Sequence, residues 1–571
     1  MPEPTSKPPA DTFSSLVRLF FSRFFDKESL SPQGDAEANV IQTLGILATP
    51  GTFISILLYF TSPQGISGWN LVSVRCLFLS ASMAIIAFLV VFEWDALFLD
   101  LRDYQVLLPL PVPLWKLFLA KMTAFLFFLG LFLAAINIFS AFFWPSFFDA
   151  GNYFAVMGTH LAIVIAAGLF SALAAACIQG LLLALVPARI FRVVATFAQT
   201  ILMSALVMLF FLCPLFSGGI RMLMKAHTGA ERYIPAYWFT GLYEQLRPAT
   251  RDSALPGLGR MALPGLGWVL AIFAVTHLPG YRRQARKLIE TPPSNPAGPG
   301  RLRVALNSAL DRLLLRDPLQ QGVFHFIGQT IGRSMKHRLF LAVYAGFGVA
   351  LVVFGIDQND GEGLLTLLIL RQHFVPEPIG LLRIPFTLSF VLITGLRAAF
   401  SFPSELRANW AFQISDANQT RQCMIAMRKW IMVCGVLPLF LLLLPLELTF
   451  FSWAAVLFQT VCGVTMSMLM VEVIFFDFRK IPFTCGYFPE RSNLVWLLAI
   501  YVAGLTLYSS TMADLEAWLM WRPQYIAVFV ATAAGVWLAS WKWRGQNKSE
   551  DALDYLGDDD PVIRTLELTP H

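Results

Sequence analysis

Long apolar segments separated by short polar ones are the most regular feature of this sequence. Several reach or approach the roughly 20 residues that a helix needs to cross a hydrocarbon core of about 30 Å. Runs of this length in lipid are predicted to be helices, because a helix satisfies its own backbone groups. The predicted spans are residues 43–61, 73–97, 115–144, 155–186, 193–216, 264–279, 338–356, 383–402, 429–447, 450–476, 494–509 and 523–541. This pattern predicts an all-α polytopic integral membrane protein with about twelve transmembrane helices.

Composition agrees with the pattern. Hydrophobic residues make up 57% of the 571 residues, and charged residues only 14%; the mean hydropathy is +0.64. Soluble globular chains are closer to half apolar and a quarter charged, so a soluble protein is excluded. The seven cysteines are scattered without CxxC or metal-ligand spacing, which favours small core residues over a metal site.

The distribution of Lys and Arg orients the predicted helices, since these residues are retained on the cytoplasmic side. Basic residues flank the loops 99–121, 187–192, 401–429 and 477–491, whereas loops such as 61–70 and 445–449 contain none. Loop 216–261 is an exception, because it is basic although it is predicted on the opposite side. The preference of Lys and Arg for the cytoplasmic side is weaker in a loop of this length. We therefore expect both termini on the cytoplasmic side of a bacterial inner membrane.

The order of the segments indicates two similar halves. A leader of residues 1–42 with an interfacial amphipathic helix precedes a six-helix half at 43–280, and a basic linker at 281–337 with a second interfacial helix follows. A second six-helix half at 338–541 and an acidic tail at 542–571 complete the chain. Parallel repeats of this kind place a transport pathway between the halves. The alternative is that any twelve-helix protein divides into two sixes.

The loop Leu99–Lys121 is the most distinctive polar segment. It contains Leu-Pro-Leu-Pro-Val-Pro preceded by charged and aromatic residues. Prolines restrict the backbone, so the loop is expected to hold one shape and to transmit movement to its flanking helices. Its charged side chains suit the orientation of a protein partner. The alternative is an ordinary stiff cytoplasmic turn.

This loop resembles the one between the second and third helices of ABC exporter permeases of the second exporter class. In that family the loop contains a coupling helix that fits a groove on the ATPase subunit. The resemblance implies contacts to a separate nucleotide-binding ATPase subunit for these residues: Asp100, Arg102, Asp103, Tyr104, Leu108, Pro109 and Pro111. The second-half counterpart keeps Glu405, Arg407 and Trp410 but lacks the Leu-Pro-Leu-Pro turn.

Motifs of catalysis are missing from the sequence. No GxxxxGK[ST] phosphate loop occurs, so ATP is expected on the partner chain and no cofactor on this one. No HExxH, GxSxG or Cys/His cluster supports hydrolytic or metal chemistry. The sequence therefore predicts a transport subunit that is not itself an enzyme, with the lipid bilayer and an unidentified substrate as partners and no nucleic acid.

Two further features are candidates for a pathway. Glu472 is surrounded by apolar residues in a predicted span, where an ionisable group is costly. Tyr237, Trp238 and Phe239 belong to an aromatic external segment, which suits an interfacial helix or a lid over the exit of a lipid-like substrate. Helix-end anchoring is the alternative for both.

These observations predict a membrane permease subunit of an ATP-binding-cassette exporter. An ion-coupled secondary transporter is the first alternative, and it predicts acids inside the membrane that are needed for transport. A polytopic lipid- or sugar-transfer enzyme is the second, and it predicts a cluster of acids or histidines at one membrane face, which is not evident.

Overall fold

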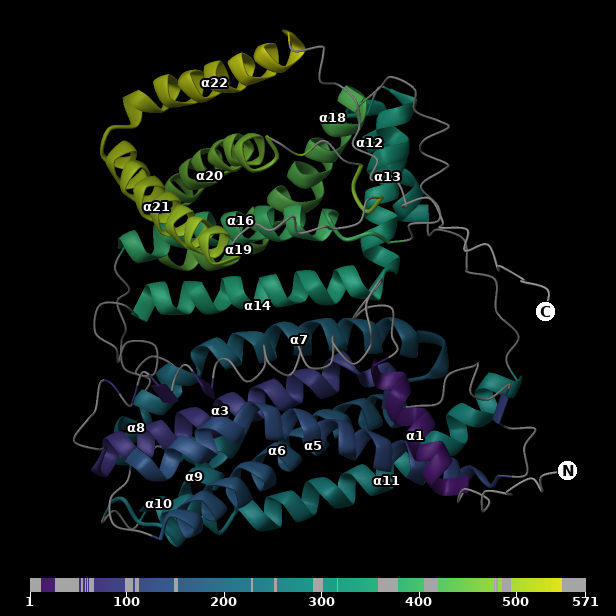
Figure 1. Ribbon diagram of the computed structural model, residues 1–571. Helices are drawn as coiled ribbons and strands as arrows, with labels where there is room; N and C mark the ends of the chain where they lie inside the picture. Colours follow the sequence, from purple (N-terminus) through teal and green to yellow (C-terminus); the bar gives the residue numbers. More distant parts are fainter. Residues whose placement is uncertain are drawn as a thin grey trace, which may run out of the picture. The chain divides into compact units, whose positions relative to one another are not determined.

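A computed structural model defines the fold (Figure 1). It describes residues 12–25, 51–52, 55–56, 58, 60, 66–97, 106–107, 112–147, 152–226, 229–250, 254–290, 301–315, 317–357, 378–404, 420–476, 478, 481–484 and 494–546. Of the residues that it describes, 91% are helical and none lies in a strand. The prediction of an all-α polytopic membrane protein is confirmed.

Within the described ranges, nine helices are long and apolar enough to cross a membrane, rather than the twelve predicted. They are Gly68–Phe92, Trp115–Phe143, Tyr153–Leu185, Val193–Gly218, Leu255–His277, Met335–Gly355, Ile379–Phe400, Arg421–Phe450 and Trp453–Ile474. The predicted span 43–61 lies mostly outside the described residues. Residues 494–509 lie within a helix that is not one of the nine, and Pro523–Ala539 is a shorter apolar segment.

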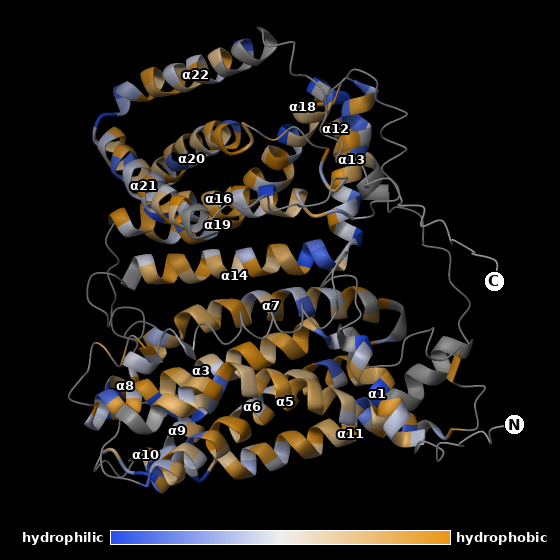
Figure 2. Cartoon of the chain, viewed as in Figure 1, coloured by the Kyte–Doolittle hydropathy of each residue, from blue (hydrophilic) through white to orange (hydrophobic). Residues whose placement is uncertain are grey.

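The described helices divide into two compact units. Unit 1 contains α1 (Thr12–Phe25) to α11 (Ala262–Glu290), and unit 2 contains α12 (Arg301–Leu313) to α22 (Ile526–Gln546). Figure 2 shows that the long helices are apolar along most of their length. Large apolar side chains also remain exposed, among them Phe127 at 63% and Leu442 at 76%. Such surface is expected where the solvent is lipid.

Helix α3 (Gly68–Phe92) is the centre of unit 1. It packs against α6 (Tyr153–Leu185) and α7 (Ala188–Gly218). Helix α6 in turn packs against α11 and α5 (Leu114–Phe147). Small residues along α6 let neighbouring backbones approach closely, which is how helices associate in lipid. The buried residues Leu79, Val164 and Phe239 belong to the resulting core.

The leader helix α1 packs against α5. Its Phe20 is almost fully buried, and the Lys121 ammonium lies 5.4 Å from the centre of the Phe20 ring. Apolar and basic residues alternate along α1 with helical spacing, so one face suits packing and the other suits a polar environment. This contact fixes α1 to the first turns of α5.

Helix α16 (Pro378–Phe400) is the centre of unit 2. It packs against α14 (Met335–Asp357), α20 (Trp453–Ile474) and α21 (Leu494–Trp521). The continuous stretch of α18 (Thr420–Trp430), a π-helical segment η4 (Ile431–Val436) and α19 (Leu437–Phe450) completes this core. Helix α13 (Pro318–Arg333) packs on α18, where Lys429 donates to the Leu314 carbonyl and to Gln320 Oε1, both at 2.8 Å.

The two units differ in the connection before their last helix. Unit 1 inserts four short helices between α7 and α11: α8 (Ile220–Ala226), η2 (Ala230–Tyr233), α9 (Pro235–Leu246) and α10 (Ala254–Gly259). Unit 2 joins α21 to α22 through the short η5 (Pro523–Tyr525). The inserted helices are therefore a feature of unit 1, and they are the elements that build the candidate site.

A glycine allows helices α19 and α20 of unit 2 to pack closely. A Cβ on Gly463 of α20 would lie 2.3 Å from Cε1 of Phe440 on α19, whereas one on Gly535 of α22 would meet nothing within 4 Å. We expect Gly463→Ala to be less stable than the control Gly535→Ala by about 1–3 kcal/mol, because the buried ring must move. Unfolding of the purified protein in detergent measures this, and equal stabilities would contradict the packing described.

Candidate functional site

The inserted helix α9 forms the lid of the candidate site. Pro235 occupies its first turn, where its missing N–H leaves no bond unmade, and the helix ends at Leu246. Its aromatic side chains point inward: Tyr237 and Phe239 are fully buried, and the Tyr237 hydroxyl donates to the Phe216 carbonyl at 2.8 Å. Burial raises the pKa of the Tyr237 phenol, so it remains a neutral donor. Helix α9 is thereby fixed to the end of α7.

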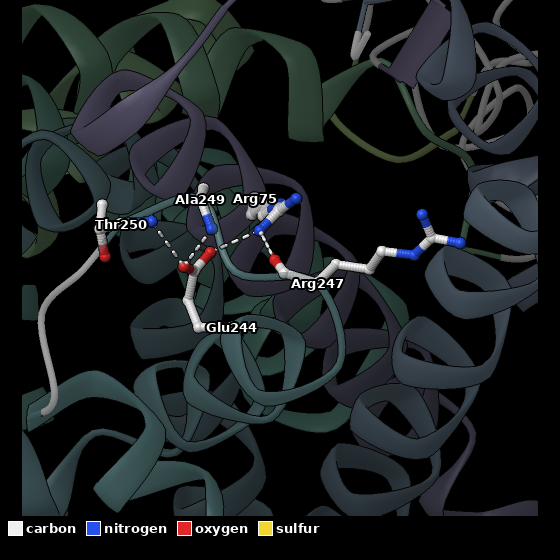
Figure 3. Close-up of polar contacts among 5 residues, drawn as sticks. All are labelled: Arg75, Glu244, Arg247, Ala249 and Thr250. Atoms are coloured by element: carbon white, nitrogen blue, oxygen red, sulfur yellow. Dashed lines mark hydrogen bonds and ion pairs between the residues drawn. The ribbon is translucent and has the colours of Figure 1, made fainter. Parts of the chain in front are cut away.

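A buried ion pair holds the other end of α9 (Figure 3). Arg75 of α3 forms an ion pair with Glu244 of α9, and the two side chains are only 6% and 1% exposed. Arg75 Nη1 also donates to the Arg247 carbonyl at 2.7 Å, and its guanidinium lies 4.2 Å from the centre of the Tyr243 ring. Figure 3 shows the Arg247 side chain extending away from the pair.

The second oxygen of Glu244 binds the backbone that follows α9. Its Oε2 accepts from the amides of Ala249 at 2.7 Å and Thr250 at 3.2 Å. A charge inside an apolar bundle costs free energy unless it is paired and hydrogen-bonded. Both carboxylate oxygens and the guanidinium have such partners here, so the pair joins α3, the end of α9 and the next turn into one structure.

Helices α9 and α10 cross through two glycines. A Cβ on Gly241 would lie 2.4 Å from the Leu255 carbonyl oxygen, and one on Gly259 would lie 2.5 Å from the Leu242 amide nitrogen. Only glycine allows backbones this close. The crossing makes α9 and α10 a single rigid cover rather than two independent helices.

An apolar cavity of about 390 Å³ lies beside the start of α9 and is open on one side. Helices α3, α6 and α7 form its walls through residues such as Met83, Phe170 and Leu206, and η2 with the start of α9 closes one end at Ile234 and Tyr237. Ser80 and Ser171 are among its few polar lining residues. A cavity with this lining binds apolar groups rather than charged or strongly polar ones.

The coupling-loop residues predicted from the sequence lie outside the described part of the chain. This applies to Asp100, Arg102, Asp103, Tyr104, Leu108, Pro109 and Pro111 in the first half, and to Glu405, Arg407 and Trp410 in the second. Their role stays a prediction.

The predicted pathway residues have different surroundings. Tyr237 lines the cavity, while Phe239 and the partly buried Trp238 pack against Phe170 of α6. Glu472 lies apart from them in unit 2, where its Oε2 is 3.6 Å from Nε of Arg428. The structure therefore brings the aromatic residues to one site and gives Glu472 an ion-pair partner of its own.

Reasoning from sequence missed the residue that anchors the lid. Arg75 is a lone arginine about two turns inside α3, and this isolated charge in an apolar segment was the available signal. Its partner Glu244 lies 169 positions away, and sequence spacing alone does not reveal that contact. Two acids of unit 2, Glu447 and Glu516, were also missed. Within the described ranges, no group of three or more His, Cys, Asp or Glu is placed to hold a metal ion.

Comparison with known proteins adds no relative: no protein-family model, no curated protein and no solved structure matches this chain. The class that the fold defines is a multi-pass, all-helical membrane protein. Its particular function is inferred from the site.

Removing either member of the ion pair tests how strongly the lid is held. We expect Arg75→Gln or Glu244→Gln to lower the free energy of unfolding by about 3 kcal/mol, because each leaves a buried charge without its partner. The double variant should lose less than the sum of the single losses, as a double-mutant cycle in detergent will show. Arg232→Gln, at an exposed position before α9, is the control and should change stability by less than about 0.5 kcal/mol. Additive losses would contradict a direct coupling.

Proposed function

We propose that this chain is the transmembrane subunit of an ATP-binding-cassette exporter that moves an apolar or amphipathic substrate. The observation that carries the proposal is the cavity of about 390 Å³ in unit 1, which is apolar in its lining and closed at one end by the start of a helix held through a buried ion pair. A concave, mostly apolar pocket with few polar groups is the usual form of a site for an apolar ligand. The cavity serves in this proposal as a substrate site.

The lid gives the cavity a direction. It lies at the end of unit 1 where α3 and α6 begin and α7 ends. The positive-inside pattern assigns this end to the side away from the cytoplasm. Movement of α9 would open the cavity outward, which suits export across a bacterial inner membrane. The Arg75–Glu244 pair keeps the lid closed until the bundle moves.

Energy would enter at the opposite end of the same helices. The loop 99–121 joins the end of α3 to the start of α5, and α3 also carries Arg75. A push on this loop by a separate ATPase would therefore act on the helix that holds the lid. The resemblance of Asp103 and Pro109 to residues of a coupling helix supports this assignment. Helix α5 begins within this predicted loop, at Leu114, and the Pro113 carbonyl accepts from the Lys116 amide at 2.9 Å.

Co-purification tests the ATPase partner. We expect an ATPase to be recovered with the full chain from its native membrane, and Asp103→Asn with Pro109→Ala to lower that recovery at least tenfold. A loss of about 1.4 kcal/mol in binding gives such a change. The matched control is Asp514→Asn with Pro523→Ala, which also alters one acid and one proline but at the opposite membrane face. Failure to recover any ATPase with the unaltered chain would refute the proposal.

Filling the cavity tests the substrate site. Ala174 of α6 lines the cavity, and Ala271 of α11 is exposed on the outer surface of unit 1. We expect Ala174→Phe to weaken binding of the apolar fluorescent probe 1-N-phenylnaphthylamine to the purified protein several-fold, because the ring occupies the space of the probe. Ala271→Phe should leave binding unchanged. Equal binding by both variants would place the probe elsewhere.

A further inference from the structure

Unit 2 contains two buried acids at one end of its helix bundle. Glu447 of α19 is 6% exposed and Glu516 of α21 is 1% exposed. They are close enough for a Coulomb interaction between the two carboxyl groups. Both lie near the ends of their helices that face the short connections 451–452 and 522–525. The two acids therefore share one buried region.

A third polar side chain faces the same region. Gln459 of α20 is fully buried, and Cys462, one turn further along the same helix face, interacts electrostatically with Glu516. Neither amide atom of Gln459 has a hydrogen-bond partner among the described residues, and the same holds for all four carboxylate oxygens of Glu447 and Glu516. Buried polar atoms are nearly always satisfied in proteins. This group of six atoms therefore points to a bound positive charge or proton.

The surrounding helices carry few other ionisable groups near this region. Cys462 of α20 and Tyr508 of α21 are neutral near pH 7 when unperturbed. Asp514 of α21 is exposed, and Arg383 of α16 is partly buried at the same end of the bundle. Glu447 is the acid that interacts electrostatically with Glu516. Two like charges in apolar surroundings repel strongly, so both carboxyl groups ionised together are disfavoured.

Hydroxyl groups extend the polar surface into the bundle. Ser467 of α20 and Tyr508 of α21 lie eight residues from Gln459 and Glu516, a distance of about 12 Å along each helix. The Tyr508 hydroxyl lies close to Ser467 and to Ser389 of α16. Hydroxyls both donate and accept, and are suited to passing a proton. Unit 2 thus holds a second buried group of polar side chains about two turns from the acids along the same helices.

We propose that Glu447 and Glu516 bind one proton between them, in the buried region that Gln459 and Cys462 also line. A shared proton removes the repulsion between the carboxyl groups, as in other buried carboxylate pairs. It also needs no further ligands, which agrees with the lack of a three-residue metal-binding group in the described ranges. Unit 2 accordingly carries a proton-binding site in addition to the transport role proposed for unit 1.

Infrared difference spectroscopy of the purified full chain tests this site. The carboxyl C=O band is recorded between about pH 6 and pH 10, where exposed Asp and Glu are already ionised. The unaltered protein should show one protonated carboxyl group near pH 7. Glu447→Gln combined with Glu516→Gln should abolish the band, and Asp514→Asn, on the same helix two residues away, should retain it.

Each single variant provides a second readout that does not require the double variant to fold. Coupled acids lose their protons in two widely separated steps, so removing one acid should move the remaining step by about one pH unit or more toward lower pH. A band that survives in the double variant, or a step that does not move in the single variants, would overturn the proposal. The proposal would also be overturned if Glu447 and Glu516 were both ionised at pH 7 and the purified protein bound Na⁺ but not choline. None of these outcomes depends on transport, so the role proposed for unit 1 is tested separately.

Discussion

The structure of unit 1 depends on the satisfaction of one buried charge. Arg75 lies inside a helix that lipid and apolar side chains surround, and an unpaired guanidinium there would be strongly unfavourable. Glu244, the Arg247 carbonyl and the ring of Tyr243 supply its partners. All three belong to α9 or to the residue that ends it. The requirement to satisfy Arg75 thus determines where the inserted helices lie and keeps the apolar cavity covered.

This arrangement links stability to the proposed transport. The ion pair that stabilises the closed lid is made by α3, the same helix that leads into the loop 99–121. Any movement of α3 relative to α9 must break or stretch a buried, charge-assisted contact, which makes the closed state well defined. The glycine crossing of α9 and α10 lets the cover move as one body. A rigid lid attached to α3 by the ion pair and to α7 by the Tyr237 hydrogen bond has a well-defined closed state.

The two units use buried charge differently. In unit 1 opposite charges meet and fix a helix, whereas in unit 2 two like groups interact and are disfavoured as a fully ionised pair. Unit 2 has no inserted helices between α21 and α22, so its acids lie close to a short connection instead of beneath a cover. The two units therefore carry distinct polar sites, and the difference between these sites arises from the inserted helices and from a few ionisable residues.

The sequence by itself determined the all-helical membrane class, because the length of an apolar run and the demand for internal backbone hydrogen bonds leave no other structure. It also indicated the aromatic segment around Tyr237, since clustered aromatics after a span are readily seen. The pattern did not give the extent of each helix: it does not show that Leu494–Trp521 extends far beyond the predicted 494–509. Only the tertiary structure paired Arg75 with Glu244, Glu447 with Glu516, and α9 with the cavity. These contacts join residues far apart in the chain, and they arise from how helices rotate and pack, which no local pattern of hydrophobic and polar positions specifies.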